Sequence, residues 1–169
     1  MLHRFMHTLL RPGTLGAFVL AMLLAPLTVR SATDSTTMAV TATVVSTCGI
    51  TASPLAFGSY VMGQTDAGTS VVVTCTNGTT YTVSLSAGVG ASATVGARKM
   101  TGPTSQTLTY VIYSDAGRTT VWGDTIGTNT VAGTGNGTPQ GISAYGRIAA
   151  SQTSGVGAYA DTVTVTLTY

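Results

Sequence analysis

Residues 161–169, DTVTVTLTY, decide the fold, because apolar and polar side chains alternate strictly over this stretch. One face of the segment carries Val163, Val165, Leu167 and Tyr169. Alternation with a period of two is typical of a strand with one buried face. The pattern runs to the last residue of the sequence, so we expect another segment to cover the apolar face and free backbone edge of this strand.

A second alternating segment, residues 37–45 with the sequence TMAVTATVV, stands ahead of the first cysteine. Its apolar face comprises Met38, Val40, Ala42 and Val44. Two such segments at opposite ends of one domain predict a subunit that donates one strand and lacks another. The alternative is that residues 37–45 form the first strand of their own domain, which requires the linker Ser46-Thr47 to let the strand return.

The first 32 residues have the pattern of an export signal. The start is basic, residues 15–25 are apolar but too short to span a bilayer, and small residues follow. We therefore predict a cleaved signal peptide over residues 1–32, with a retained membrane anchor as the alternative. The mature chain then comprises an N-terminal donor-strand extension, residues 33–46, and one domain, residues 47–169.

The composition argues against catalysis and against binding of nucleic acid. Beyond residue 32 the chain has four basic and five acidic residues, so no basic surface is available for phosphates. Both histidines, His3 and His7, lie in the predicted signal, and the sequence has no glutamate. Most of the usual general bases, activated nucleophiles and zinc or iron ligands are therefore missing. We expect no enzymatic activity, no cofactor, no metal and no nucleic acid partner.

Cys48 and Cys75 are the only cysteines of the chain. Two cysteines in an exported protein are expected to pair as a disulfide. A bridge that closes a loop of this size stabilises a domain by about 3 to 4 kcal/mol on the chain-entropy model. A metal pair or a redox-active thiol is disfavoured, because CxxC spacing and supporting ligands are both missing.

The rest of the chain alternates short β-rich segments with glycine, asparagine, aspartate and serine, and no segment shows helical periodicity. We predict an all-β sandwich or barrel, one strand short of a seven-stranded immunoglobulin-like sandwich unless the N-terminal strand is supplied. Asn77-Gly78 predicts a tight hairpin between the second and third strands. The expected strands are residues 47–51, 69–76, 80–87, 107–113, 142–149 and the C-terminal segment, and the expected exposed loops are residues 88–96 and 125–141.

Aromatic and basic side chains are assigned structural roles. The aromatic residues concerned are Phe57, Tyr60, Trp122, Tyr145 and Tyr159. We expect them to pack in the core and against turns, with a sugar-stacking platform as the alternative. Arg98, Lys99 and Arg147 are expected to be solvated or paired with aspartates.

Short motifs follow one another along the domain in a specific order. After Cys48 come LAFGSY (55–60), VTC (73–75), YTVSL (81–85), RKM (98–100), YVIY (110–113), WG (122–123), YGRI (145–148) and GAYAD (157–161), and Tyr169 ends the series. This ordered set resembles the spore coat protein U domain, which is found in subunits of archaic, Csu-type chaperone-usher pili. The resemblance covers nearly the whole mature chain.

The resemblance implies an incomplete immunoglobulin-like β-sandwich, a Greek key that lacks its last strand. It implies that a periplasmic chaperone lends a strand, and that the N-terminal segment of an identical or related subunit replaces this strand at an outer-membrane usher. The product is a fimbria at the cell surface that serves adhesion and biofilm formation. A tip adhesin of such a pilus carries a second, N-terminal domain, for which this sequence has no room, so a shaft or adaptor subunit is expected.

Carried onto this chain, the resemblance places the donor strand at residues 37–45. The acceptor groove is then lined in part by Val163, Val165 and Leu167. Tyr169 and the terminal carboxylate are a chaperone contact, with core packing of the ring as the alternative. Two other classes stay open: a free-standing secreted β-sandwich that binds a ligand or serves as a coat protein, and a hydrolase with paired aspartates, which the missing histidine and glutamate disfavour.

Overall fold

The computed structural model describes residues 29–169, so most of the predicted signal peptide lies outside the described residues. Residues 42–169 form one compact unit, and residues up to 41 are a separate part of the chain. Residues 29–47 are exposed and have no regular secondary structure. The alternating segment 37–45 therefore has no strand partner within the described residues, and its role as a donor stays a prediction.

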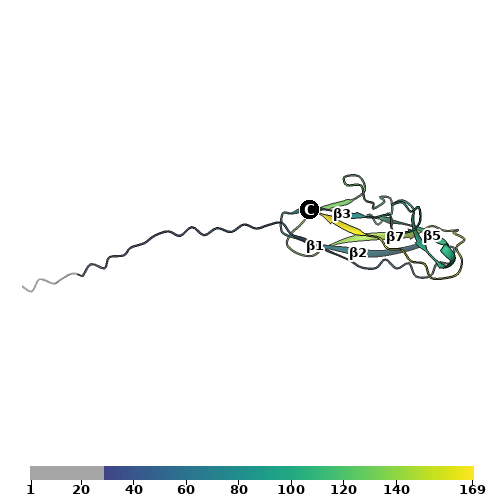
Figure 1. Ribbon diagram of the computed structural model, residues 1–169, viewed down its shortest axis with the longest axis horizontal. Helices are drawn as coiled ribbons and strands as arrows, with labels where there is room; N and C mark the ends of the chain where they lie inside the picture. Colours follow the sequence, from purple (N-terminus) through teal and green to yellow (C-terminus); the bar gives the residue numbers. More distant parts are fainter. Residues whose placement is uncertain (1–28) are drawn as a thin grey trace, which may run out of the picture. The chain divides into compact units, whose positions relative to one another are not determined.

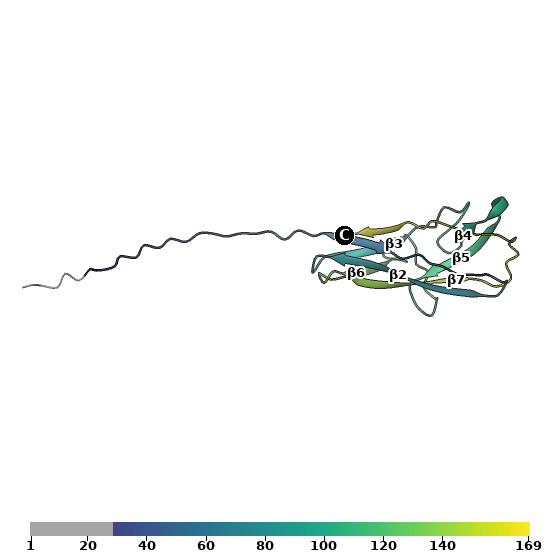
Figure 2. The same cartoon turned by 90° about the horizontal axis from the view of Figure 1, so that it is seen from below.

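Residues 42–169 form a β-sandwich of two antiparallel sheets, whose layers can be followed in Figures 1 and 2. The larger sheet has the order β1-β2-β7-β5-β4, and the smaller one the order β6-β3-β8. The elements are β1 (Cys48–Ala52), β2 (Thr65–Cys75), β3 (Thr80–Leu85), β4 (Arg98–Thr101), the 3-10 turn η1 (Pro103–Ser105), β5 (Thr107–Tyr113), β6 (Val131–Thr134), β7 (Gln140–Ile148) and β8 (Val165–Thr168). The all-β prediction is confirmed, and residues 29–169 include no helix that could cross a membrane.

The turn at Asn77-Gly78 forms, but the predicted hairpin pairing is wrong. The Thr79 N–H donates to the Thr76 carbonyl over 3.0 Å, and Gly78 has a positive φ of 84°. Yet β2 pairs with β1 and β7, whereas β3 pairs with β6 and β8 in the other sheet. Both strands alternate and each has one apolar face, so placing them in opposite sheets buries both faces in the same core.

Three other expectations about strands need correction. The predicted loop 125–141 contains β6, a short edge strand, and the first residues of β7. The strand β4, with the sequence RKMT, was not predicted, because its charged side chains give no apolar alternation. The C-terminal strand is shorter than the alternating segment, since β8 covers only Val165–Thr168.

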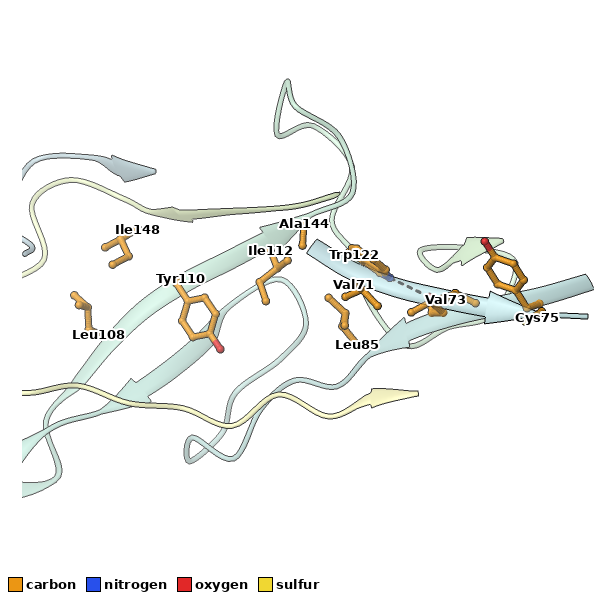
Figure 3. Packing of buried hydrophobic residues seen from close by; sticks show 12 residues of the cluster. Val71, Val73, Cys75, Leu85, Leu108, Tyr110, Ile112, Trp122, Ala144 and Ile148 are labelled. Carbon is orange, nitrogen blue, oxygen red and sulfur yellow. Dashed lines mark hydrogen bonds between the residues drawn. The ribbon is translucent and has the colours of Figure 1, made fainter. Parts of the chain in front are cut away.

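The core lies between the two sheets, where Figure 3 shows buried side chains from β2, β3, β5 and β7 spread along the strands, with Trp122 among them. Trp122 is fully buried, and its indole Nε1 donates to the Val83 carbonyl over 3.0 Å. Phe57, Tyr60 and Tyr159 are partly buried and pack against this core, as predicted. Tyr145 is the exception, because it lies outside the core with the Arg118 guanidinium 5.7 Å from its ring centroid.

Arg98, expected to be solvated or paired with an aspartate, is fully buried instead. Its guanidinium donates to four backbone carbonyls, those of Leu85, Ser86, Val95 and Trp122, over 2.8 to 3.1 Å. Removal from water lowers the pKa of this side chain. Arg98 thus joins the end of β3 to two loops. Arg147 does pair with an aspartate, Asp66, at 2.7 Å.

The predicted disulfide between Cys48 and Cys75 is confirmed. The two residues face each other in the β1–β2 register. The bridge closes a separation of 27 residues and attaches the edge strand β1 covalently to β2.

We predict that replacing Arg98 by methionine lowers the free energy of unfolding by about 3 to 5 kcal/mol, because four carbonyls lose their donor in a buried site. Lys99→Met is the matched control, since its ammonium makes one hydrogen bond, to Ala91, at the surface. The control is expected to cost less than about 1 kcal/mol. Urea denaturation of both variants measures the difference, and equal losses would contradict the structural role of Arg98.

We predict that the double variant Cys48→Ala/Cys75→Ala is about 3 to 4 kcal/mol less stable than the oxidised protein, from the loop closed by the bridge. The wild-type protein in reductant is expected to show the same loss, because the same constraint is released. Thermal denaturation with and without reductant measures both. A wild-type midpoint that reductant leaves unchanged would show that the bridge does not constrain the unfolded chain.

Candidate functional site

The sandwich is open along the side where β1 and β8 form the edges of their sheets. Each of these strands is paired on one side only, and the two lie in contact across the layers. The chain after β1 and the chain before β8 border two adjoining cavities of about 450 and 610 Å³. We call this opening, between residues 52–60 and residues 154–165, the groove. It is lined mainly by apolar side chains.

The floor of the groove is the hydrophobic core itself. Val71, Ile112 and Ala144 from the larger sheet and Leu85 from the smaller sheet line the first cavity. All four are buried members of the core cluster. The groove is therefore a place where the packing between the sheets is incomplete, and an apolar segment seated there would extend the core.

One wall of the groove is formed by the residues that follow β1. Leu55 and Phe57 pack directly on Gly146 of β7, where a Cβ atom would lie 2.8 and 2.6 Å from their side chains. The Phe57 ring also meets Tyr110 edge-on, with 5.8 Å between the ring centroids. The LAFGSY motif thus supplies the wall, and the lack of a side chain at Gly146 allows its close approach.

The other wall is the segment that leads into β8. Val163, Val165 and Leu167 are partly buried and pack against the core, as the alternation predicts. Val165 and Leu167 face Leu85 and Val83 in the register with β3. In an antiparallel ladder alternate residues direct their backbone groups to opposite sides. The side of β8 away from β3 therefore presents unpaired N–H and C=O groups, which can accept a further strand.

Asp161 fixes the start of this second wall. One carboxylate oxygen accepts from the Tyr110 hydroxyl over 2.7 Å, and the other accepts from the Val89 N–H over 2.8 Å. Burial raises the pKa of the Tyr110 hydroxyl, and the hydrogen bond to Asp161 raises the pKa further. The sequence analysis assigned Asp161 no role of its own, although the GAYAD motif contains it.

A second attachment lies one residue earlier, at Ala160. Its N–H and C=O exchange hydrogen bonds of 3.1 and 2.8 Å with Thr101 at the end of β4. Tyr159 lies over Gly102, where a Cβ would come within 2.4 Å of the ring. The wall before β8 is therefore held by β4 and β5 of the larger sheet and by the loop after β3, and its inner side borders the cavities.

The predicted donor and chaperone-contact residues are exposed. Met38, Val40 and Val44 are 84%, 86% and 83% exposed, and Tyr169 is 59% exposed. Ala42 is exposed as well. Val163 and Val165 line the groove, whereas Leu167 packs against the core and is not among the lining residues of either cavity. The apolar face of residues 38–44 has no partner among the described residues. Within the described residues, no group of three histidine, cysteine or acidic side chains could hold a metal ion.

The fold and the groove together define a β-sandwich domain with one strand position unfilled. The chain belongs to the spore coat protein U domain family, whose model matches residues 34–166. Among solved structures it resembles a chain in the crystal structure of the CsuC-CsuE chaperone-tip adhesion subunit pre-assembly complex from archaic chaperone-usher Csu pili of Acinetobacter baumannii. The TM-score is 0.59 with 23% identity, so the likeness concerns the fold.

The match covers 75% of this chain and 41% of that chain, so this protein spans less than half the length of the similar structure. No curated protein matches the sequence at a significant level.

We predict that Tyr110→Phe destabilises the domain by about 2 kcal/mol, because a buried hydrogen bond to a carboxylate is lost. Tyr81→Phe is the matched control, since Tyr81 is also buried and its hydroxyl makes no hydrogen bond with the described residues. We expect less than about 0.5 kcal/mol there. Chemical denaturation compares the two variants. Equal losses would mean that Asp161 does not depend on Tyr110 for its position.

Proposed function

We propose that this protein is a pilin, a structural subunit of a surface fimbria assembled by donor-strand complementation through the chaperone-usher pathway. The observation that carries the proposal is the open apolar groove beside the unpaired edge of β8. Membership in the spore coat protein U domain family supports it. One added strand would supply what the sandwich lacks, namely a backbone partner for β8 and apolar side chains to fill the groove.

The donor in this proposal is residues 37–45 of another copy or of a related subunit. Its backbone would pair with the free edge of β8, and Met38, Val40, Ala42 and Val44 would enter the groove. Full burial of a valine or methionine side chain contributes about 1.5 to 3 kcal/mol. Several such side chains together are comparable to the net stability of a typical domain.

The positions of the chain ends favour a linear polymer. Thr47 and Thr168 lie at the same end of the sandwich, since Thr47 pairs with Thr76 after β2 and Thr168 pairs with Thr82 near the start of β3. A donor running antiparallel to β8 would join its own domain beyond the opposite end of the groove. Each copy would then donate at one end and accept at the other, and such a heterologous contact does not close on itself.

Before assembly the groove and the free edge need protection, because an exposed edge strand beside an apolar surface promotes aggregation. We propose that a periplasmic chaperone lends a strand to the exported subunit and that an outer-membrane usher exchanges it for the next donor. Tyr169 and Val163, Val165 and Leu167 are the proposed chaperone contacts. Adhesion and biofilm formation are the proposed roles of the fimbria at the cell surface.

We predict that the mature chain forms a ladder on SDS-PAGE without boiling that collapses to monomer on heating, and that the variant Val40→Asp/Ala42→Asp forms none. A charge placed in the groove costs several kcal/mol of desolvation. Thr41→Asp/Thr43→Asp is the matched control, because these side chains lie on the opposite face of the same segment. The control variant is expected to keep the ladder.

A peptide of residues 37–45 provides the complementary measurement. Added in excess to the full-length Val40→Asp/Ala42→Asp chain, it is expected to raise the unfolding temperature, since it binds only the folded domain. A soluble monomer that neither the aspartate substitutions nor the peptide affects would overturn the proposal and favour a free-standing secreted domain.

A further inference from the structure

Hydrogen bonds fix the course of the short chain segment that joins the proposed donor strand to its domain. We call residues 45–47 the exit segment. The Thr76 N–H donates to the Thr47 carbonyl over 2.9 Å, which is one pair beyond Cys48 and Cys75 in the β1–β2 register. The exit segment thus continues the line of β1 past the end of its strand, and the disulfide fixes the pair before it.

The side chain of Thr76 adds a second attachment. Its hydroxyl accepts from the Thr47 N–H over 3.2 Å, and it lies 3.4 Å from the Val45 carbonyl and 3.3 Å from the Thr47 carbonyl, to which it can donate. One hydroxyl therefore contacts backbone groups at both ends of the exit segment. We call this set of contacts the clasp.

The turn that carries Thr76 is itself hydrogen-bonded to the loop around Gly135. The Gly78 N–H donates to the Gly135 carbonyl, and the Gly137 N–H donates to the Cys75 carbonyl. Gly135 lies so close that a Cβ there would be 2.6 Å from the Cys75 Cβ and 2.7 Å from the Thr76 carbonyl oxygen. The loop around Gly135 therefore braces the turn that carries Thr76, so the clasp is attached to a rigid support.

A donor that returned to the groove of its own domain by a tight turn would reverse direction between Val45 and Cys48. It would then lie parallel to β8, in the opposite orientation to the donor from another copy. A two-residue reversal of the most favourable type needs positive φ at both residues, here Ser46 and Thr47. Neither has a positive φ in this structure, and a β-branched residue such as threonine strongly disfavours it.

We propose that Thr76 is a positioning residue that directs the donor away from its own domain, so that the strand is given to another copy. This inference rests on the proposed function. A strand tethered by a short flexible linker acts at a millimolar effective concentration, which falls towards zero when the linker cannot span the two sites. Without the clasp, each domain's own strand would outcompete those of other copies.

The test uses the full-length mature chain, refolded from denaturant at micromolar concentration without other proteins. Thr76→Val removes the hydroxyl and keeps the shape, and Thr74→Val is the matched control, at an exposed position of β2 two residues earlier. A second variant keeps Thr76 and carries a Gly-Ser-Gly-Ser insertion between Ser46 and Thr47. Its control carries the same insertion between Ser35 and Thr36, ahead of the donor.

The readout is the ratio of monomer to polymer, measured by size-exclusion chromatography with light scattering and by SDS-PAGE without boiling. Thr76→Val is expected to raise this ratio about five-fold over Thr74→Val, the factor for one hydrogen bond. The insertion at residue 46 is expected to raise it further, and its control is not. The new monomers should bind no labelled peptide of residues 37–45, because their own strand fills the groove.

Two results overturn the inference, and they are distinguishable. If both test variants match their controls while the wild-type chain polymerises and the aspartate variant binds the peptide, the clasp has no directing role and the proposed function stands. If the wild-type chain forms no polymer and the peptide binds no variant, the proposed function itself is wrong, and this inference is wrong with it.

Discussion

The open side between β1 and β8 is the constraint on which the rest of the structure depends. A sandwich gains stability by burying the inner faces of both sheets against each other, and this burial is incomplete along the groove. The domain must keep its two edge strands in place without the backbone ladder that a further strand would provide. The disulfide and the hydrogen bonds of Asp161 and Ala160 lie beside these edges.

Contacts of other kinds hold these chain segments where the hydrogen-bond ladder of a further strand is missing. The disulfide attaches β1 to β2. Asp161 attaches the start of the second wall to Tyr110 and Val89, and Ala160 attaches it to β4. Arg98, buried at the end of β3, holds four carbonyls that have no strand partner. A buried cation is costly unless its donors are satisfied, so the guanidinium is suited to a place where several chain segments end together.

Period-two alternation predicted the strands with one buried face, and β5 has the predicted bounds. It missed β4 and β6, because RKMT and VAGT are stabilised by their neighbours more than by their own pattern. The buried position of Arg98 could not be predicted, since its acceptors come from residues 85, 86, 95 and 122 and meet only in the fold. The local sequence predicted the turn at Asn77-Gly78, but it could not indicate which sheet each of the two flanking strands joins.

For the groove, the alternation of residues 161–169 predicted one wall. The other wall is formed by Leu55 and Phe57, which belong to no alternating pattern and were noted only as part of a family motif.

The composition of the chain around residues 37–45 suits the proposed role of this segment as a donor strand. Between Asp34 and Asp66 the sequence has no charged residue, and the other face of residues 37–45 carries three threonines, together with Ala39 and Val45. Insertion of this segment into a groove would remove no charge from water, so little of the gain from apolar burial would be lost to desolvation. The same properties, high β-propensity and low charge, make an unpaired segment prone to aggregate. As the proposed donor, residues 37–45 are therefore hazardous while they are unpaired, and capture by the groove of the next copy would remove this hazard.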